Sequence, residues 1–150
     1  MTDYTAIREL MPAMVPFVRT LRLVYLELDA ERAVLRLDDD PAWHNHVGGP
    51  HAGALFTLAE SASGAVVIAS FEDLLPRVTP LAAHAEISYT RLAKGPVTAE
   101  AVLGRAAAAV RAELERTGKT VQFPVEVTLR DADGQETSRM TISWALRPHR

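Results

Sequence analysis

The sequence HNHVGGPHAGALFTLAESASG, residues 44–64, sets the architecture that we expect for the whole chain. It contains three of the five histidines, four of the eight glycines and one acidic residue, Glu60. The Ala, Leu and Val content from His51 to about Phe71 predicts one long helix, in which Gly53 and Gly64 indicate close approach of another backbone. A helix that is apolar on nearly every side must be covered on most of them, so the flanking segments are expected to pack around it.

Two elements are predicted upstream of this helix. Apolar residues recur at helical spacing from Asp3 to Met14, and two prolines limit how far that helix extends. Residues 21–39 alternate apolar and polar side chains on both sides of Asp29-Ala30-Glu31, which predicts a β-hairpin. Residues 39–50 are rich in turn formers and are expected to form the loop that leads into the long helix.

Four strand-like segments are predicted downstream, after a proline-containing loop at residues 72–80. Their connections predict two hairpins, one through Lys94-Gly95-Pro96 and one through residues 131–134. Between the hairpins a helix is predicted to end at Gly118, although its start equally fits a continuation of the preceding strand. The four segments are residues 81–92, 97–106, 120–131 and 135–147.

The predicted elements add up to an α+β architecture, in which a curved antiparallel sheet of five to six strands wraps around one long central helix. The length of 150 residues and the hydrophobic fraction of 48% fit a single domain over residues 1–150. The absence of cysteine removes thiol nucleophiles and disulfides and fits a reducing compartment. The first residues are polar where a signal peptide would be apolar, so we expect a cytoplasmic protein.

Charge and hydropathy argue against two classes of partner. The net charge of -3 arises from interspersed positive and negative residues, without the basic stripe of a nucleic-acid-binding protein. The one segment of membrane-spanning length, Ala52 to Phe71, is interrupted by Glu60 and by several hydroxyl residues, and it lacks aromatic or basic anchors at its ends. We therefore expect neither nucleic acid nor a membrane as a partner.

Glu60 is the only ionisable side chain between His51 and Glu72. An isolated buried carboxylate is costly, so it must be paired, protonated through a raised pKa, or open to a cavity. A structural carboxylate, satisfied by backbone amides or by Arg91, and a catalytic carboxylate both fit this position. Helical spacing places it on the most polar face of the helix, with Phe56, Thr57, Ser63 and Gly64.

The start of the long helix offers hydrogen-bond donors. The first amides of a helix lack internal partners and its dipole favours negative charge, so an oxyanion near His51 would be stabilised. Carbonyl chemistry also needs a carboxylate that attacks or activates water, and Glu60 follows within ten residues. A tight turn into the helix is the plainer interpretation.

His44 and His46 alternate as metal ligands do, but the spacing identifies no third ligand, and no metal is predicted.

With these residues in view, the chain resembles the hotdog-fold thioesterases, in particular the branch named for phenylacetic acid degradation. That branch carries Asn, two residues, Gly, two residues, His-Gly-Gly, and an acid seven residues after the last Gly. This chain has Asn45, Gly48, His51-Ala52-Gly53 and Glu60 at the same spacing. The order of elements from about Leu21 to Arg147 resembles that of the family as well.

The resemblance implies a thioesterase that acts on acyl-CoA or a related acyl thioester without a cofactor. It also implies a homodimer, or a dimer of dimers, with active sites at the dimer interface. Glu60 is implied as general base or nucleophile, the Ala52 amide as oxyanion donor, and Asn45 of the partner subunit as the group that orients water or substrate. His51 would support the turn near the thioester carbonyl. The residues expected to contact substrate are Gly53, Phe56, Thr57, Tyr89, Arg91 and Lys94.

Three positions depart from the family pattern. Ala52 replaces the first Gly of His-Gly-Gly, which adds a methyl group and disfavours a positive φ. Glu60 replaces the more common Asp and reaches one methylene further. Arg91 stands where several relatives carry a hydroxyl residue, and it is expected either to pair with Glu60 and lower its pKa or to bind a phosphate. A module that binds an acyl chain or coenzyme A without hydrolysing it is therefore the second hypothesis, ahead of a hydratase.

Overall fold

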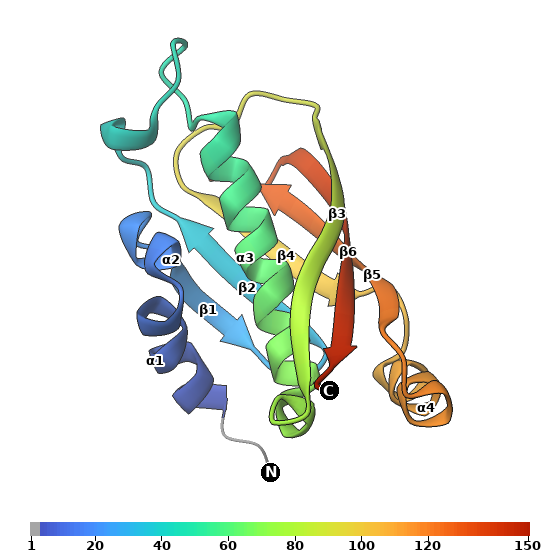
Figure 1. The fold of residues 1–150 in the computed structure, drawn as a ribbon. Coiled ribbons are helices and arrows are strands. Elements are labelled where there is room, and N and C mark those ends of the chain that lie inside the picture. The colour runs from blue at the N-terminus through green and yellow to red at the C-terminus, as the bar shows by residue number, and fades with distance from the viewer. Residues whose placement is uncertain (1–3) are drawn as a thin grey trace.

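The computed structural model describes residues 4–150, in which a long helix, α3, lies across one antiparallel sheet of six strands (Figure 1). The strand order is β1-β2-β4-β5-β6-β3. The predicted α+β architecture, a curved antiparallel sheet around one helix, is confirmed. The helices are α1 (Tyr4–Met14), α2 (Pro16–Thr20), α3 (Ala52–Ser70) and α4 (Ala107–Thr117). The strands are β1 (Val24–Leu28), β2 (Arg32–Leu37), β3 (Val78–Tyr89), β4 (Val97–Leu103), β5 (Val121–Arg130) and β6 (Glu136–Pro148).

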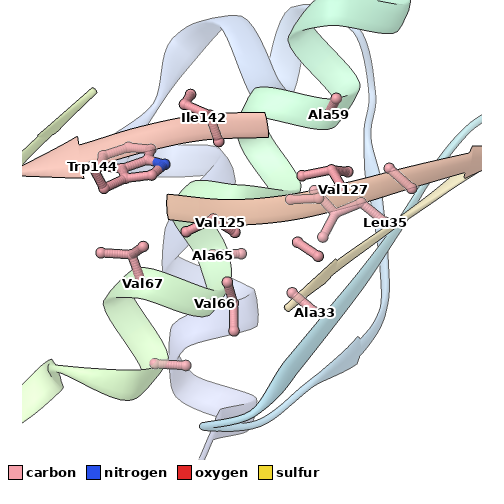
Figure 2. Close-up of a cluster of buried hydrophobic side chains, with 14 of the residues drawn as sticks. Ala33, Leu35, Ala59, Ala65, Val66, Val67, Val125, Val127, Ile142 and Trp144 are labelled. Atoms are coloured by element: carbon pink, nitrogen blue, oxygen red, sulfur yellow. The ribbon is translucent and has the colours of Figure 1, made fainter. Parts of the chain in front are cut away.

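Helix α3 forms the centre of the hydrophobic core. Thirteen of its 19 residues are buried, because the sheet covers one side and α1 and α2 lie beside it (Figure 1). By length and composition α3 is the one helix in residues 4–150 that could cross a membrane, and 67% of its apolar window is buried inside the fold. Figure 2 shows its small side chains meeting those of β2, β5 and β6, among them Ala33, Leu35, Val125, Val127 and Ile142.

Ser63 and Gly64 fit α3 against Trp144 of β6. The Trp144 indole Nε1 donates a hydrogen bond to Ser63 Oγ over 2.9 Å, and Ser63 Oγ donates to the carbonyl of Glu60 over 2.6 Å. A Cβ atom on Gly64 would lie 3.3 Å from the Trp144 ring, and one on Gly53 would lie 3.2 Å from His51 Nδ1. The prediction that these glycines meet another backbone is therefore wrong, since both accommodate aromatic side chains.

Ser63→Ala is expected to lower the free energy of unfolding by about 1–3 kcal/mol, because the buried Trp144 N–H would lose its acceptor. Ser138→Ala is the matched control. Ser138 is also buried, but its hydroxyl has no hydrogen-bond partner in the described part of the chain, so its removal should cost little. Urea denaturation of both variants measures the difference. Equal destabilisation by the two substitutions would contradict the role given to Ser63.

The predicted hairpin through Lys94-Gly95-Pro96 is wrong. Strand β3 pairs with β6 at the sheet edge, whereas β4 lies between β2 and β5. The connection crosses over the end of the β5–β6 hairpin, where the Ala132 N–H donates to the Lys94 carbonyl over 3.0 Å and the Lys94 N–H donates to Asp131 Oδ2 over 3.3 Å. Gly95 has a φ of +67°, so the turn exists but serves a crossover.

The other local predictions agree better with the structure. The hairpins within residues 21–39 and through residues 131–134 are confirmed, and Gly118 ends α4 in the left-handed conformation with a φ of +60°. The first helix is confirmed from Tyr4 onward, and Asp3 lies outside the described residues. The predicted loop at residues 72–80 is shorter than expected, because residues 78–80 belong to β3, an edge strand in which proline is tolerated.

The fold brings three segments together at one end of the sheet. The loop before α3, the first turn of α3 and the crossover between β3 and β4 meet there, at the top of Figure 1. Nearly all the residues that the sequence assigned to the candidate site lie on these segments. Glu60 lies further along α3, in the middle of the helix.

Candidate active site

The loop before α3 is held in shape by Asn45. Its Oδ1 accepts hydrogen bonds from the N–H groups of Val47 over 3.0 Å and Gly49 over 3.2 Å. The Asn45 N–H in turn donates to the Gly49 carbonyl over 2.7 Å. Gly48 completes the turn with a φ of +78°, a conformation that residues with a Cβ rarely adopt. Asn45 thus shapes the entrance to the helix in its own protomer, and its predicted action on a partner's site stays a prediction.

His51 caps the helix and leaves one amide free. Its Nδ1 accepts a hydrogen bond from the Gly53 N–H over 2.9 Å, which places the proton of the neutral ring on Nε2. The His51 carbonyl accepts from Ala54 and Leu55. The N–H of Ala52 has no acceptor in the described part of the chain. An unpaired donor therefore remains at the positive end of the α3 dipole.

A cavity of about 370 Å³ lies between the loop and the crossover, and Ala52 is among the residues that line it. The Tyr89 hydroxyl donates to the Ala52 carbonyl over 3.0 Å and so ties the end of β3 to the start of α3, while burial raises the pKa of Tyr89. Arg91 and Lys94 line the same cavity, together with Asn45. Its apolar lining comes from Val47, Pro50, Leu55, Leu92 and Ala93.

One stripe of residues along the first three turns of α3 is not buried by the rest of the fold. Residues four apart on a helix lie on one face, so the unburied residues of the first three turns form a continuous stripe from the free amide of Ala52 to the Glu60 carboxylate. Thr57 Oγ1 donates to the Gly53 carbonyl within this stripe over 2.9 Å. The stripe consists of the five helix residues that the sequence assigned to the site, Ala52, Gly53, Phe56, Thr57 and Glu60.

The Glu60 carboxylate is half-buried and unpaired. Burial raises its pKa because it disfavours the charged form, and no group in residues 4–150 donates a hydrogen bond or an ion pair to lower it. The predicted pairing with Arg91 is wrong within the protomer. Arg91 lies beyond the end of β3, where its Nη1 donates to Gln135 Oε1 over 3.2 Å. A carboxylate without a structural partner is therefore left available for chemistry.

His44, the first histidine of the loop, contacts an acidic side chain of the same loop. His44 Nε2 lies 2.6 Å from Asp39 Oδ1, and residues 4–150 contain no group of three or more His, Asp or Glu side chains that could hold a metal ion. Trp43 packs against the core, and the Arg22 guanidinium lies over its ring at 5.1 Å from the centroid. Trp144 is likewise buried in the core.

Comparison with known proteins places this chain in a family. A family model described as a domain of unknown function, DUF4442, matches residues 4–146. The chain belongs to the DUF4442 family. No curated protein matches it.

Solved structures resemble the DUF4442 protein over nearly its whole length. PA5026 from Pseudomonas aeruginosa, a protein of unknown function described as a "probable thioesterase", is 28% identical with a TM-score of 0.86, covering 99% of this chain and 97% of that chain. A thioesterase family protein from Silicibacter pomeroyi is 20% identical with a TM-score of 0.77, covering 98% and 100%. A mutant of the thioesterase PA1618 from Pseudomonas aeruginosa is 17% identical with a TM-score of 0.79, covering 99% and 96%.

These neighbours show that the DUF4442 protein has the hotdog fold of the thioesterase superfamily, which confirms the predicted fold and superfamily. The narrower resemblance to the phenylacetic acid branch stays a prediction.

The sequence did not predict which apolar residues line the cavity. Leu55 has the pattern of a core helix residue and Leu92 that of a strand end, so no local signal distinguishes them as cavity residues.

Proposed function

We propose that this DUF4442 protein hydrolyses acyl thioesters, with acyl-CoA as the expected substrate class. The proposal is carried by two groups on the unburied stripe of α3, the Ala52 amide that has no acceptor and the unpaired Glu60 carboxylate. Thioester hydrolysis needs these two groups, a donor where negative charge develops and a carboxylate that activates the attacking group. The description of PA5026 and the name of the Silicibacter pomeroyi protein support the same reaction class.

The proposed reaction combines these two groups from different subunits of a homodimer, because eight residues of α3 separate them by roughly 12 Å within one chain. The Glu60 carboxylate takes a proton from water as the water oxygen bonds to the thioester carbon, and the carbonyl electron pair moves onto oxygen. The Ala52 N–H stabilises that oxyanion. When the carbonyl reforms, the C–S bond breaks and the thiolate takes the proton from Glu60, which yields an acid and a thiol. The raised pKa of Glu60 suits a general base that works near neutral pH. Direct attack by Glu60 is the other route.

Coenzyme A fits the cations beside the cavity. Arg91 and Lys94 line it together with Ala52, so a thioester carbonyl bound at Ala52 would bring a phosphate-bearing carrier toward both cations. The apolar lining accommodates the uncharged part of the substrate, and the volume of about 370 Å³ falls in the range of small-molecule sites.

We propose a homodimer formed through β3. This strand is 12 residues long and pairs only with β6, so its outer edge presents unpaired backbone groups that natural proteins rarely leave exposed. A two-fold axis would pair β3 with the same strand of the partner subunit and join two six-stranded sheets. The dimer would also allow Asn45 of the partner subunit to act as the resemblance implies.

Leu81→Asp is expected to convert the dimer to a monomer, because it places a charge on the proposed β3 interface. Val102→Asp is the matched control, since Val102 of β4 is 38% exposed and Leu81 is 44% exposed, but only Leu81 lies on β3. Size-exclusion chromatography with light scattering measures the mass of each variant. A dimer that survives Leu81→Asp and dissociates with Val102→Asp would place the interface elsewhere.

A turnover screen tests the proposed activity. Thiol release is measured for acyl-CoA substrates with short, aromatic and long acyl groups, and at least one class is expected to be hydrolysed.

The second candidate function is a module that binds an acyl chain or coenzyme A without turnover. It is favoured by the extra methyl group of Ala52 and by Arg91 in place of a hydroxyl residue. It predicts no thiol release with any substrate and a co-purified ligand in native mass spectrometry.

A further inference from the structure

The crossover between β3 and β4, residues 90–96, has a cavity on each side. Arg91, Leu92 and Lys94 line the cavity of about 370 Å³ at the start of α3. The same three residues line a second cavity, of about 380 Å³, against the turn between β5 and β6. Leu92 is 71% exposed, and only Ala93 of the four residues from 91 to 94 packs against the core. Apolar packing therefore does little to fix the position of this segment, which depends on its hydrogen bonds.

Hydrogen bonds hold the crossover at two points. The two N–H groups that directly follow β3 donate to the Thr137 carbonyl over 2.9 and 3.2 Å. At the other end, the Lys94 N–H donates to Asp131 Oδ2 over 3.3 Å, and the Lys94 carbonyl accepts from the Ala132 N–H over 3.0 Å. The β5–β6 turn thus holds the crossover at Lys94, which is one of the two cations beside the candidate site.

Asp131 is a buried acidic residue, 7% exposed, at the start of that turn. Its Oδ1 accepts hydrogen bonds from the N–H groups of Asp133 over 3.0 Å and Gln135 over 3.1 Å, which shapes the turn. A buried carboxyl group is costly unless its oxygen atoms are hydrogen-bonded, and the second oxygen finds its donor in the crossover. The two oxygen atoms therefore have separate roles, since Oδ1 organises the turn and Oδ2 binds the crossover.

Both cations of the candidate site are joined to the β5–β6 turn. Lys94 is joined through its backbone, and Arg91 through its side chain, whose Nη1 donates to Gln135 Oε1 over 3.2 Å. On its other side the crossover meets the loop before α3, because a Cβ atom on Gly49 would lie 3.5 Å from the Ala93 carbonyl oxygen. The position of the turn therefore sets where the two cations stand relative to the start of α3.

We propose that Asp131 is a positioning residue for the carrier of the substrate, and that it holds the crossover where Arg91 and Lys94 bind the phosphates of coenzyme A. The choice of carrier rests on the proposed function. Asp131 lines the second cavity together with both cations, and a negative charge there by itself weakens the binding of a phosphate. The fixed position of the crossover is the gain that offsets this cost, so the charge effect and the positioning effect have opposite signs.

Asp131→Asn tests this proposal. The amide oxygen of asparagine can still accept from the turn, but its NH₂ group replaces Oδ2 and cannot accept from the Lys94 N–H. We expect KM for acyl-CoA to rise about 5- to 20-fold with kcat within about twofold of the wild type. The N-acetylcysteamine thioester of the same acyl group lacks the phosphates, so its KM and kcat should not change. A KM for acyl-CoA that falls or stays the same would overturn the proposal.

Asp133→Asn is the matched control. It removes the same charge from the same turn, and the Asp133 side chain accepts no hydrogen bond in residues 4–150. Its KM for acyl-CoA should therefore not rise. An equal rise in KM for both variants would trace the effect to the charge of the turn and overturn the role of Asp131.

Ala132→Pro is a second variant, which changes no charge. It removes the N–H that donates to the Lys94 carbonyl. Ala132 is the second residue of a turn that the Gly134 N–H closes on the Asp131 carbonyl over 3.0 Å, and proline is favoured at that position. The same rise in KM for acyl-CoA is expected, so the proposal stays testable if Asp131→Asn does not fold.

A binding measurement does not depend on activity. Isothermal titration calorimetry with coenzyme A itself should show the Kd rising about 5- to 20-fold in Asp131→Asn and in Ala132→Pro, but not in Asp133→Asn. If this pattern appears and the wild type hydrolyses no thioester, the hydrolase is refuted and the role of Asp131 is supported. If both variants bind coenzyme A as tightly as a wild type that hydrolyses acyl-CoA, the role of Asp131 is refuted and the hydrolase stands.

Discussion

Glu60→Gln is expected to lower kcat/KM for acyl-CoA hydrolysis by about 100- to 10,000-fold, the range typical of a lost general base. The carboxylate is half-buried, unpaired and at the end of the unburied stripe of α3, so it is free to take a proton from water. Glutamine preserves the shape but cannot accept that proton, and the fold should remain intact. Thiol release from the best substrate of the screen measures the loss.

Glu72→Gln is the control for this prediction. Glu72 is the next acidic residue after Glu60 in the sequence, and it lies exposed just after the end of α3. Its substitution changes the net charge by the same amount, so it should leave kcat/KM within about twofold of the wild type. Undiminished hydrolysis by Glu60→Gln would remove Glu60 from the mechanism.

The same variant has an expected signature in stability. Because burial raises the folded-state pKa of Glu60, the folded chain binds more protons than the unfolded chain between the ordinary glutamate pKa and the raised value. The free energy of unfolding contributed by Glu60 therefore falls as pH rises through that window and stays lower above it. Glu60→Gln lacks this loss, so its free energy of unfolding should rise relative to that of the wild type as the pH increases. Urea denaturation from pH 4 to pH 8 measures the difference between the two proteins.

The parts of the fold that the sequence predicted are those that depend on local chemistry. Helix α3 was predictable because its Ala, Leu and Val residues leave only one polar face. Phe56, Thr57 and Glu60 of that predicted face are unburied, whereas Ser63 and Gly64 are buried against Trp144. The Gly118 cap and the turn through residues 131–134 were predictable because glycine adopts positive φ there without a steric cost. In each case the deciding residues are neighbours in the chain.

The parts that the sequence did not predict depend on distant residues. Lys94-Gly95-Pro96 shows that the chain turns, but strand pairing is decided by contacts with segments up to 70 residues away, as when β3 pairs with β6. The freedom of Glu60 from Arg91 depends on where β3 ends relative to α3. The alternation of β1 points Tyr25 inward, yet only the packed structure shows that its hydroxyl lacks a partner.

Ala52→Pro is expected to lower kcat for thioester hydrolysis by about 100- to 1,000-fold, the cost of removing one oxyanion-hole donor. Ala52 is the first residue of α3, a position that proline favours, and its N–H has no acceptor in residues 4–150, so proline breaks no existing hydrogen bond. The preceding His51 has a φ of -64° and a ψ of 142°, an extended conformation that a following proline requires. Thermal unfolding should therefore show a stable variant that has lost its activity.

Ala52→Gly separates the amide from the methyl group. It keeps the N–H and restores the glycine that the related motif carries, so it should retain hydrolysis at or above the wild-type rate. The contrast between the two variants isolates one hydrogen-bond donor at the positive end of α3, because both change the same side chain and only proline removes the N–H. If Ala52→Pro kept the full rate, the oxyanion would have to be stabilised by another group, and the entrance to α3 would serve substrate binding alone.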